Sequence, residues 1–423
     1  MPRLLLLATT TTYKAQAFLD AAARIGVEVT VGTDRPQVLA ALHPAGNLTL
    51  DFSDPSWAVH EIAAFARRYP IAAVLAADDE GTEIAAAAAR ALGLPGNDRD
   101  AVVKARHKDQ LRAALQAANL PVPWFRSISL AIAPEEVADQ IDYPCVLKPL
   151  SSSASRGVIR ADDPSQFVAA FERLRTILDG SAVETAPPEI LVEGYIPGLE
   201  VALEGVLEDG SLRVLALFDK PDPLDGPFFE ETIYVTPSRH APAMQEALAA
   251  MAQRACTAIG LQQGPLHAEL RWNDSGAWLL EAAPRSIGGL CARTLRFGDG
   301  SVTLEELLLR QALQQDIHGL ERETRAAGVM MVPIPRAGML REVRGTAAAV
   351  AVPGIEDVRV AIPPGQEVAP PPEGGRYLGF LFARGATPEA VEEALRTAHA
   401  RLEIDIEPLQ RSWAGGGSHV GVL

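Results

Sequence analysis

The first hundred residues alternate short apolar runs with segments of helical periodicity. Apolar runs at 4–8, 27–33 and 72–76 predict buried strands, and the sequence between and after them predicts helices at 14–25, 62–69 and 80–92. Strands that alternate with helices in this way indicate a parallel sheet covered by helices. No GxGxxG motif follows the first strand, so the pattern does not favour a dinucleotide site. We therefore expect an N-terminal α/β domain over residues 1–105.

The middle of the chain mixes strands and helices in a pattern typical of α+β structure. A strand at 143–149 ends in Lys148 and leads into a loop of small residues at 151–157. We divide this region at residue 190 into two parts, 106–190 and 191–325. The other predicted segments are helices at 105–118, 164–178, 243–259 and 302–315, an exposed loop at 179–188, strand-rich sequence at 190–218 and a hairpin at 267–284.

The composition changes after residue 319, where proline and glycine become frequent. This change predicts a separate C-terminal α+β domain over 326–412, and the glycines at 415–417 predict a flexible tail over 413–423.

Composition and charge narrow the possible partners. The 423 residues are 48% hydrophobic and 22% charged, which is enough to build several packed domains. The net charge of −16 repels phosphate backbones, so we expect no nucleic-acid partner. Three cysteines without metal-ligand spacing, and no apolar stretch long enough to span a bilayer, predict a cytoplasmic protein without a membrane partner. A homodimer is the usual expectation for a soluble enzyme.

The hairpin carries two acidic residues that can face each other. A three-residue loop at 274–276 would place Asn273 opposite Ala277 and Glu269 opposite Glu281. Like charges on facing strand positions are destabilising unless a cation lies between them, and carboxylate oxygens suit Mg²⁺. The alternative is a solvated sheet face on which charges of both signs alternate.

Two further segments have features of a nucleotide site. Lys148 can reach phosphate oxygens while the backbone N–H groups of the following loop point inward, although such a loop can also be only a loop. It is not a Walker A motif. Downstream, Glu193 ends one strand and Glu200 begins the next, with Gly198 between them. An exposed strand edge there could lie beside an adenine, with a carboxylate for ribose hydroxyls, or both glutamates could be structural.

Taken in order, these elements resemble the ATP-grasp superfamily. The segments that carry the resemblance are ARHKDQLRAALQAANLPVP, YPCVLKPLSSSASRGV, LVEGYIPGLE and HAELRWNDSGAWLLEAAPR. The resemblance implies an ATP-grasp fold of α/β and α+β parts: a Rossmann-like N-terminal domain, a two-part nucleotide-binding core and a C-terminal α+β domain. It implies that ATP is bound by Lys108, Lys148, Ser152, Ser153, Ser155, Gly157, Glu193, Gly194, Tyr195, Ile196 and Glu200. It also implies Glu269 and Glu281 as ligands of Mg²⁺, for which Mn²⁺ can substitute, and Arg285 at the reacting phosphate.

One position departs from the family pattern. Many members have an asparagine as a further metal ligand where this chain has Ala283. The L-amino acid ligase branch resembles this chain in lacking it, and the segments 218–238, 281–298 and 328–385 also look like that branch. The resemblance places 228–238 near the substrate pocket. It implies a substrate-binding set of Glu231, Arg285, Gly288, Gly289 and Arg293.

The activity implied is ATP-dependent formation of an amide or peptide bond between a small carboxylate and an amine, with amino acids as the expected substrates. The catalytic set is Arg285, Lys148 and His267, with His267 or Glu231 as the base. Two alternatives stay open. One is an ATP-grasp ligase or carboxylase of nucleotide-precursor or other small-acid metabolism, and the other is a non-catalytic ATP-binding regulatory protein.

Overall fold

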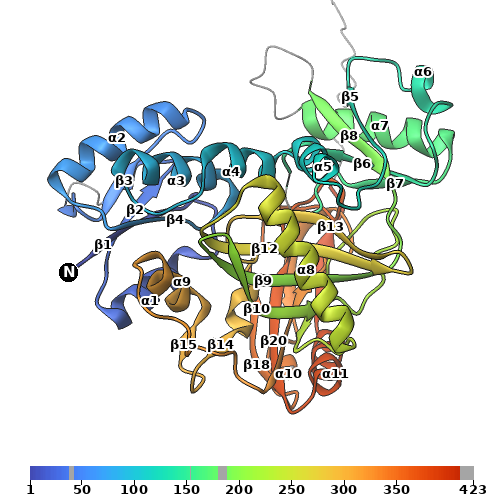
Figure 1. The fold of residues 1–423 in the computed structure, drawn as a ribbon. Coiled ribbons are helices and arrows are strands. Elements are labelled where there is room, and N and C mark those ends of the chain that lie inside the picture. The colour runs from blue at the N-terminus through green and yellow to red at the C-terminus, as the bar shows by residue number, and fades with distance from the viewer. Residues whose placement is uncertain (38–41, 153, 180–187, 410–423) are drawn as a thin grey trace, which may run out of the picture.

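A parallel four-stranded sheet organises the N-terminal part of the structure, a computed structural model that describes residues 1–37, 42–152, 154–179 and 188–409. Apolar side chains alternate between its two faces. Leu4 and Leu6 of the first strand pack with the first helix, whereas Leu5 and Leu7 pack against the next two helices. The strand order is β3 (Asn47–Thr49), β2 (Glu28–Thr33), β1 (Arg3–Leu7) and β4 (Ala73–Ala76), with helices α1 (Ala15–Ile25), α2 (Pro55–Arg68) and α3 (Asp79–Leu92) on its faces (Figure 1).

Two helices of this region differ from the prediction. Helix α2 begins seven residues earlier than expected, because Asp54 caps it by accepting a hydrogen bond from the Trp57 amide. The helix expected at 105–118 is two helices, α4 (Arg99–Arg106) and α5 (Lys108–Ala117), separated by His107 in an extended conformation. The Lys108 amide then donates to the Leu150 carbonyl at 3.0 Å. The break therefore fixes the start of α5 against the loop of small residues.

A small subdomain carries the strand that ends in Lys148. Its antiparallel sheet has the order β5 (Phe125–Ser129), β8 (Glu189–Gly194), β6 (Cys145–Pro149) and β7 (Ile159–Ala161). Helix α7 (Pro164–Asp179) buries Phe167, Phe171 and Leu174 against this sheet, and the short α6 (Glu135–Ala138) lies beside it. The loop predicted at 179–188 lies almost entirely outside the described residues, as does the predicted tail at 413–423.

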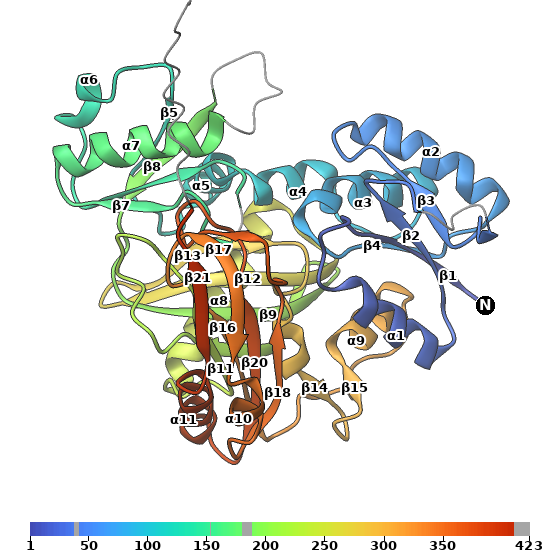
Figure 2. The same ribbon diagram turned by 180° about the vertical axis from the view of Figure 1, so that it is seen from behind.

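An eight-stranded antiparallel sheet forms the centre of the molecule. Strand β11 pairs with β16, so the predicted boundary at residue 326 falls within one continuous sheet (Figure 2). The order is β13 (Gly276–Ala283), β12 (Gly264–Asn273), β9 (Leu199–Glu208), β10 (Ser211–Asp219), β11 (Ile233–Thr236), β16 (Ala326–Val332), β20 (Gly379–Gly385) and β18 (Ile355–Val360). Helix α8 (Pro242–Ile259) packs on β12 and β13, and α9 (Leu304–Ala312) packs against α1.

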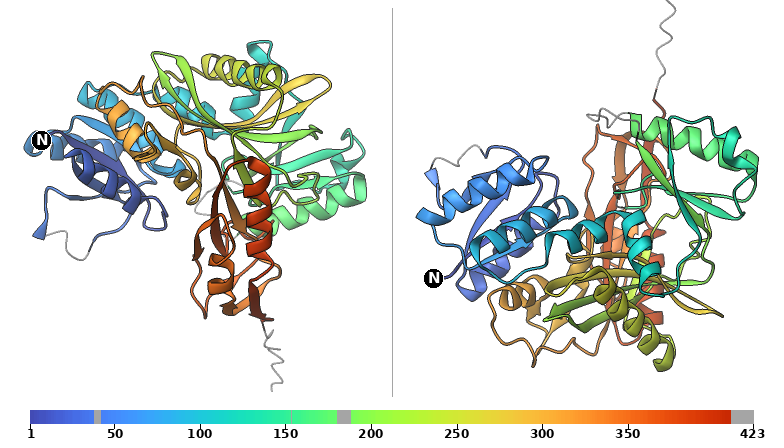
Figure 3. Two further views of the ribbon diagram at one scale, coloured as in Figure 1. Left: turned by 90° about the horizontal axis from the view of Figure 1, so that it is seen from below. Right: turned by 45° about the horizontal axis from the view of Figure 1, so that its top comes forward.

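The remaining elements complete the C-terminal part. Two short strands, β14 (Arg296–Phe297) and β15 (Val302–Thr303), form a hairpin, so the helix predicted from 302 begins only at Leu304. A three-stranded sheet contains β19 (Glu367–Val368), β17 (Gly338–Arg344) and β21 (Glu403–Glu407), and helices α10 (Thr346–Val350) and α11 (Pro388–His399) lie near the end of the chain. Figure 3 shows the N-terminal domain and the small subdomain as separate lobes beside the central sheet. Among the helices that the structure describes, none combines the length and apolarity needed to cross a bilayer.

Candidate active site

The two carboxylates of the hairpin face each other as predicted, but through a different register. The connecting loop is one residue shorter than expected, because Asn273 pairs with Gly276. That register alone would place Leu280 opposite Glu269. A β-bulge in β13 inserts one extra residue there and returns Glu281 to the position opposite Glu269. The prediction for the loop was therefore wrong, and the prediction for the carboxylate pair is confirmed.

Three cations lie around this carboxylate pair. Lys108 Nζ is 3.4 Å from Glu281 Oε2, and Lys220 Nζ is 3.6 Å from Glu269 Oε1. The His267 ring also approaches Glu269, with Nε2 at 3.6 Å from Oε1. The two carboxylates are thus balanced by the protein's own cations. Facing carboxylate oxygens are the donors that a hard divalent cation requires, so these residues fit a magnesium ion.

Lys220 was not among the residues predicted from sequence. It follows β10, is buried, and donates to Glu200 at 2.8 Å and to Glu231. Burial alone would lower the pKa of Lys220, but the surrounding carboxylates outweigh burial and raise it. One signal could have found it: Lys220 ends an apolar strand and precedes a proline, as Lys148 does.

His267 carries a positive charge in this environment. Its Nδ1 lies 2.5 Å from Glu204 Oε1. Burial alone would lower the pKa of His267, but Glu204 and Glu269 outweigh burial and raise it to about 9. An imidazolium has no lone pair to accept a proton, which counts against the base role predicted for His267.

Lys148 and Glu193 belong to a buried ion-pair chain. Lys148 Nζ lies 2.5 Å from Glu193 Oε1, and Arg112 of α5 donates to the same carboxylate at 2.8 and 3.2 Å. Burial alone would raise the pKa of Glu193, but Arg112 and Lys148 lower it to about 2. The carboxylate of Glu193 is therefore committed to these two cations, and only its backbone remains available beside an adenine.

The loop of small residues folds over the same region. Lys108 Nζ donates to the Ser152 carbonyl at 2.7 Å, and Ser155 and Gly157 have positive φ angles of 53° and 75°. The Gly157 amide donates to the Pro372 carbonyl at 2.9 Å, which ties the loop to the C-terminal part of the chain. Ser153 lies outside the described residues.

The segment that joins β8 to β9 is held by Arg271 of β12. Arg271 donates to the Glu200 carboxylate at 2.8 Å and to the Ile196 carbonyl at 2.5 Å. The Tyr195 hydroxyl donates to Asp225 at 2.9 Å. Gly194, Tyr195 and Ile196 therefore present a fixed backbone edge, as a base-binding segment requires, while Glu200 already has two cationic partners, Lys220 and Arg271.

Arg285 joins the hairpin to the N-terminal domain. Its Nη2 lies 2.8 Å from Asp79 Oδ2 at the start of α3. Lys14 makes a second connection nearby, because its Nζ donates to the carbonyls of Ala77 and Ser286 at 2.7 and 3.0 Å. Burial and the charge of Arg285 lower the pKa of Lys14 to about 8.

The structure does not bring Arg293 into the candidate site. Its guanidinium pairs with Asp357 at 2.9 Å and lies 4.2 Å from the centre of the Phe382 ring. Both partners come from the C-terminal part of the chain, far along the sequence from the loop that contains Arg293. This arrangement does not support the substrate-binding role predicted for Arg293.

The predicted residues gather around two adjoining cavities. The first, which we call the hairpin cavity, has a volume of about 120 Å³ and is lined by residues that include Lys108, Lys148, Ser152, Ser155, Gly194, Tyr195, Ile196, Glu200, Glu269, Glu281 and Arg285. The second, the threonine cavity, has a volume of about 210 Å³, and its lining includes Thr9, Thr11, Thr12, Lys14, Asp78, His267, Gly288, Gly289 and Tyr377. Glu231, Glu269 and Arg285 line both cavities. The two spaces therefore meet at Glu231, Glu269 and Arg285.

Comparison with protein families matches three parts of the chain. Residues 141–294 match the ATP-grasp domain, residues 19–96 match the ATP-grasp N-terminal domain, and residues 330–407 match the L-amino acid ligase C-terminal domain 2. Relatives include the uncharacterized protein y4rH of Sinorhizobium fredii, which is 26% identical over 83% of this chain and 71% of its own length. Alanine–anticapsin ligase of Bacillus amyloliquefaciens is 25% identical, over 54% of this chain and 52% of the relative. The chain thus spans about half the length of that ligase.

Solved structures with the same fold include an L-amino acid ligase from Bacillus licheniformis. It superposes with a TM-score of 0.78 at 24% identity, over 96% of this chain and 99% of the ligase. An N5-carboxyaminoimidazole ribonucleotide synthetase in complex with ADP gives a TM-score of 0.69 at 13% identity. These likenesses establish the fold, and the three family matches agree with it in order along the chain. The chain therefore has the ATP-grasp fold, with ATP-grasp domains at 19–96 and 141–294 and a C-terminal part that matches the L-amino acid ligase C-terminal domain 2.

Proposed function

We propose that this protein uses ATP to join the carboxylate of one small molecule to the amine of another, with amino acids as the substrates. The observation that carries the proposal is the meeting of the two cavities at Glu269 and Arg285. One cavity presents lysines and a carboxylate pair, as a nucleoside triphosphate with its metal requires. The threonine cavity adjoins it and is lined by hydroxyls and charged groups, so a second substrate can lie there against the terminal phosphate of ATP.

In the first step, the substrate carboxylate in the threonine cavity attacks the γ-phosphate of ATP in line. An acyl phosphate forms and ADP leaves. Lys108, Lys148 and Arg285 offset the negative charge that develops on the transferred group. Glu269 and Glu281 would hold a magnesium ion, which would supply positive charge to neutralise part of the charge of the phosphates.

In the second step, the amine attacks the acyl carbon, an amide bond forms and phosphate leaves. We assign Glu231, which lines both cavities, rather than His267 as the base that accepts the proton of the amine. Burial raises the pKa of Glu231 above its usual value despite the neighbouring Lys220, and a raised pKa favours proton acceptance near neutral pH.

Water must be excluded while the acyl phosphate exists. The loop at 151–157 can do this, because Ser152, Ala154 and Ser155 line the hairpin cavity and the Gly157 amide is bonded to the C-terminal part. We therefore expect the described loop residues, 151–152 and 154–157, to shield the acyl phosphate from water.

Phosphate and ADP release by the purified chain, with Mg·ATP and pairs of amino acids, tests the proposal. We expect release only when an acid and an amine are both present, with a product whose mass equals the two substrates minus water. Glu281→Gln should lose this release, and Glu135→Gln, an exposed acid on α6, should keep it. Substrate-dependent ADP release without a condensed amino-acid product would contradict the substrate class, and absence of any turnover across the panel would contradict the ligase.

A further inference from the structure

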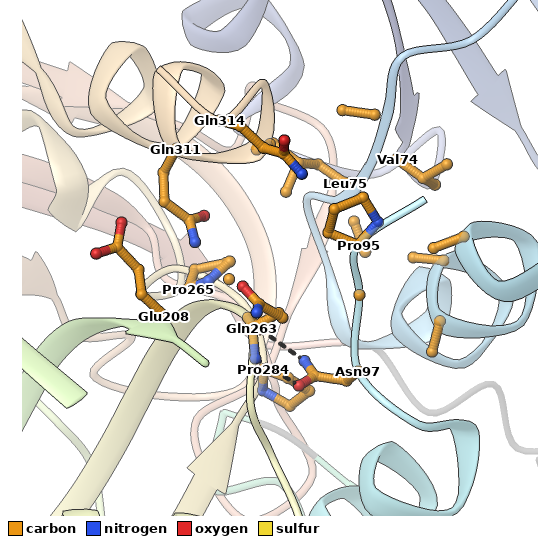
Figure 4. Close-up of a pocket in the computed structure, with 18 of the residues that line it drawn as sticks. Val74, Leu75, Pro95, Asn97, Glu208, Gln263, Pro265, Pro284, Gln311 and Gln314 are labelled. Atoms are coloured by element: carbon orange, nitrogen blue, oxygen red, sulfur yellow. Dashed lines mark hydrogen bonds between the residues drawn. The ribbon is translucent and has the colours of Figure 1, made fainter. Parts of the chain in front are cut away.

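A third cavity lies between the N-terminal domain and the central sheet, and we call it the interdomain cavity. It is lined by β4, by one side of α3, by the β9–β10 turn, by the start of β12 and by the end of α9 (Figure 4). Its volume of about 660 Å³ is within the range of small-molecule sites, roughly 300–1,000 Å³. It shares no lining residue with the hairpin cavity or the threonine cavity. The space therefore needs an explanation separate from the proposed ligase reaction.

The walls combine an apolar surface with amide groups. Figure 4 shows Leu75 and Pro95 on one side and Gln311 and Pro265 on the other. Gln311 Nε2 donates to the Leu207 carbonyl at 3.1 Å, whereas its Oε1 is buried and has no hydrogen-bond partner among the described residues. An unpaired buried acceptor is unfavourable, so an N–H or O–H donor brought into the cavity would be stabilised there.

The charge of the lining is negative. Three carboxylates, Glu208, Asp209 and Asp316, contribute to it, and the described lining contains no lysine or arginine. The one histidine, His318, has its Nε2 at 4.0 Å from Glu208 Oε2. A ligand with a carboxylate or phosphate would meet repulsion without a cationic partner, whereas an ammonium group would meet acceptors.

We propose that the interdomain cavity binds a small amine that has an apolar body and no anionic group. The apolar body packs between Leu75, Pro95 and Pro265, and the N–H donors face Gln311 and the carboxylates. ATP and free amino acids do not fit this description, because both carry anionic groups. The site is therefore distinct in ligand class from both cavities of the proposed reaction.

Two walls of this cavity continue directly into the active site. Pro284 lines the interdomain cavity and the next residue, Arg285, lines the hairpin cavity. On the facing wall, β4 ends at Ala76 and leads into Asp79, which pairs with Arg285 at 2.8 Å. A ligand wedged between these walls acts on the Arg285–Asp79 pair. We therefore infer that occupancy of the interdomain cavity alters the affinity for ATP, and by linkage that ATP alters the affinity for the ligand.

Leucinamide is a suitable probe, because it has an isobutyl body, an ammonium group and a neutral amide. Its binding to the full chain should be measured by isothermal titration, with and without a saturating non-hydrolysable ATP analogue and Mg²⁺. We expect binding that persists with the analogue at a shifted dissociation constant, and that weakens about fivefold or more in the double variant Glu208→Gln, Asp316→Asn. N-acetylleucinamide, which lacks the ammonium group, should bind the unmodified chain as weakly as leucinamide binds the variant.

The control variant Glu135→Gln removes an exposed carboxylate elsewhere and should bind leucinamide normally. Three results would each overturn the site. They are loss of leucinamide binding when the analogue is present, equal affinity in the double variant, and no binding of leucinamide up to about 10 mM, the range of a weak ligand. An identical dissociation constant with and without the analogue would overturn the coupling to Arg285. None of these outcomes depends on ligase turnover, so failure of the proposed reaction is recognised separately.

Discussion

The buried pair of Arg112 and Glu193 allows a quantitative test of the candidate site. Arg112 is fully buried and donates to Glu193 at 2.8 and 3.2 Å and to the Leu280 carbonyl at 3.1 Å. Arg112→Met keeps most of the side-chain length and removes the charge. Glu193 would then keep Lys148 as its only cationic partner among the described residues, and the Leu280 carbonyl would lose the donor Arg112.

The expected cost is a large part of the stability of a domain. Removing one partner of a buried ion pair typically costs about 3–5 kcal/mol. The pKa of Glu193 leads to a similar figure, because lowering it from 4.5 to about 2 corresponds to about 3 kcal/mol of stability at neutral pH. Since Lys148 remains, we expect the lower end of this range, about 3 kcal/mol.

The pH dependence has a definite sign. The pKa of Glu193 is lower in the folded protein than in the unfolded chain, so its contribution is fully present above about pH 4.5. It is lost as the pH falls from about 4.5 to about 2. In Arg112→Met, the pKa of Glu193 rises toward its ordinary value, so the variant should lose less stability than the unmodified protein over the acid range.

Urea unfolding at pH 7 and at pH 3 measures both effects, and the KM for ATP reports on Lys148. Arg112→Lys keeps a charge without the two-point contact and should be intermediate in stability. Arg126→Met removes an exposed arginine from β5 of the same subdomain and serves as the control. If Arg112→Met lowered the free energy of unfolding at pH 7 by less than about 1 kcal/mol, which is the range of a surface ion pair, the reasoning would be refuted.

Three further substitutions test other parts of the site. Glu281→Gln should lower substrate-dependent ADP release by about 100-fold or more and raise the Mg²⁺ concentration required, and an unchanged Mg²⁺ dependence would contradict its role as a ligand. Lys220→Met should remove the cation that Glu200, Glu231 and Glu269 share, and one carboxylate oxygen of each lies within 4.8 Å of the others. Thermal unfolding should then show a larger stabilisation by Mg²⁺ in this variant than in the unmodified protein, and an equal shift would argue against metal binding near this cluster. Arg293→Ala should change the KM values of both substrates less than about twofold, because its partner is Asp357; a tenfold rise would restore its predicted role.

Local patterns were sufficient to predict most elements and the pairing of the two hairpin carboxylates. The apolar run at 4–8 and the alanine-rich segment at 80–92 correspond to β1 and α3. The pattern did not predict the break at His107, because helical periodicity continues through it and the break is fixed by a contact between Lys108 and Leu150. The pattern did not predict the bulge in β13 either, because an apolar residue at position 280 fits either face of the strand.

Side-chain partners across the fold were the part that sequence reasoning could not supply. Arg112 and Glu193 are 81 positions apart, and Arg293 and Asp357 are 64 positions apart (357 − 293). Motif position suggested that Glu193 faces an adenine and that Arg293 faces a substrate, whereas each is paired with a residue that no local pattern connects to it. Roles that depend on a free charge are therefore the least predictable from sequence.

The arrangement of these ion pairs bears on how the site can bind a triphosphate. Lys148 is shared with Glu193, Lys108 lies beside Glu281, and Arg285 is paired with Asp79, so each predicted phosphate-binding cation already has an anionic partner. Phosphate oxygens must compete with those partners, and if Glu269 and Glu281 held a magnesium ion, Lys108 would no longer be needed beside Glu281 and could meet the phosphates. Metal and nucleotide binding are then mutually dependent, because each supplies the opposite charge that the other leaves unpaired. On this argument, the affinity for ATP should depend more steeply on Mg²⁺ in the unmodified chain than in Glu281→Gln, where Lys108 is already free of its charged partner.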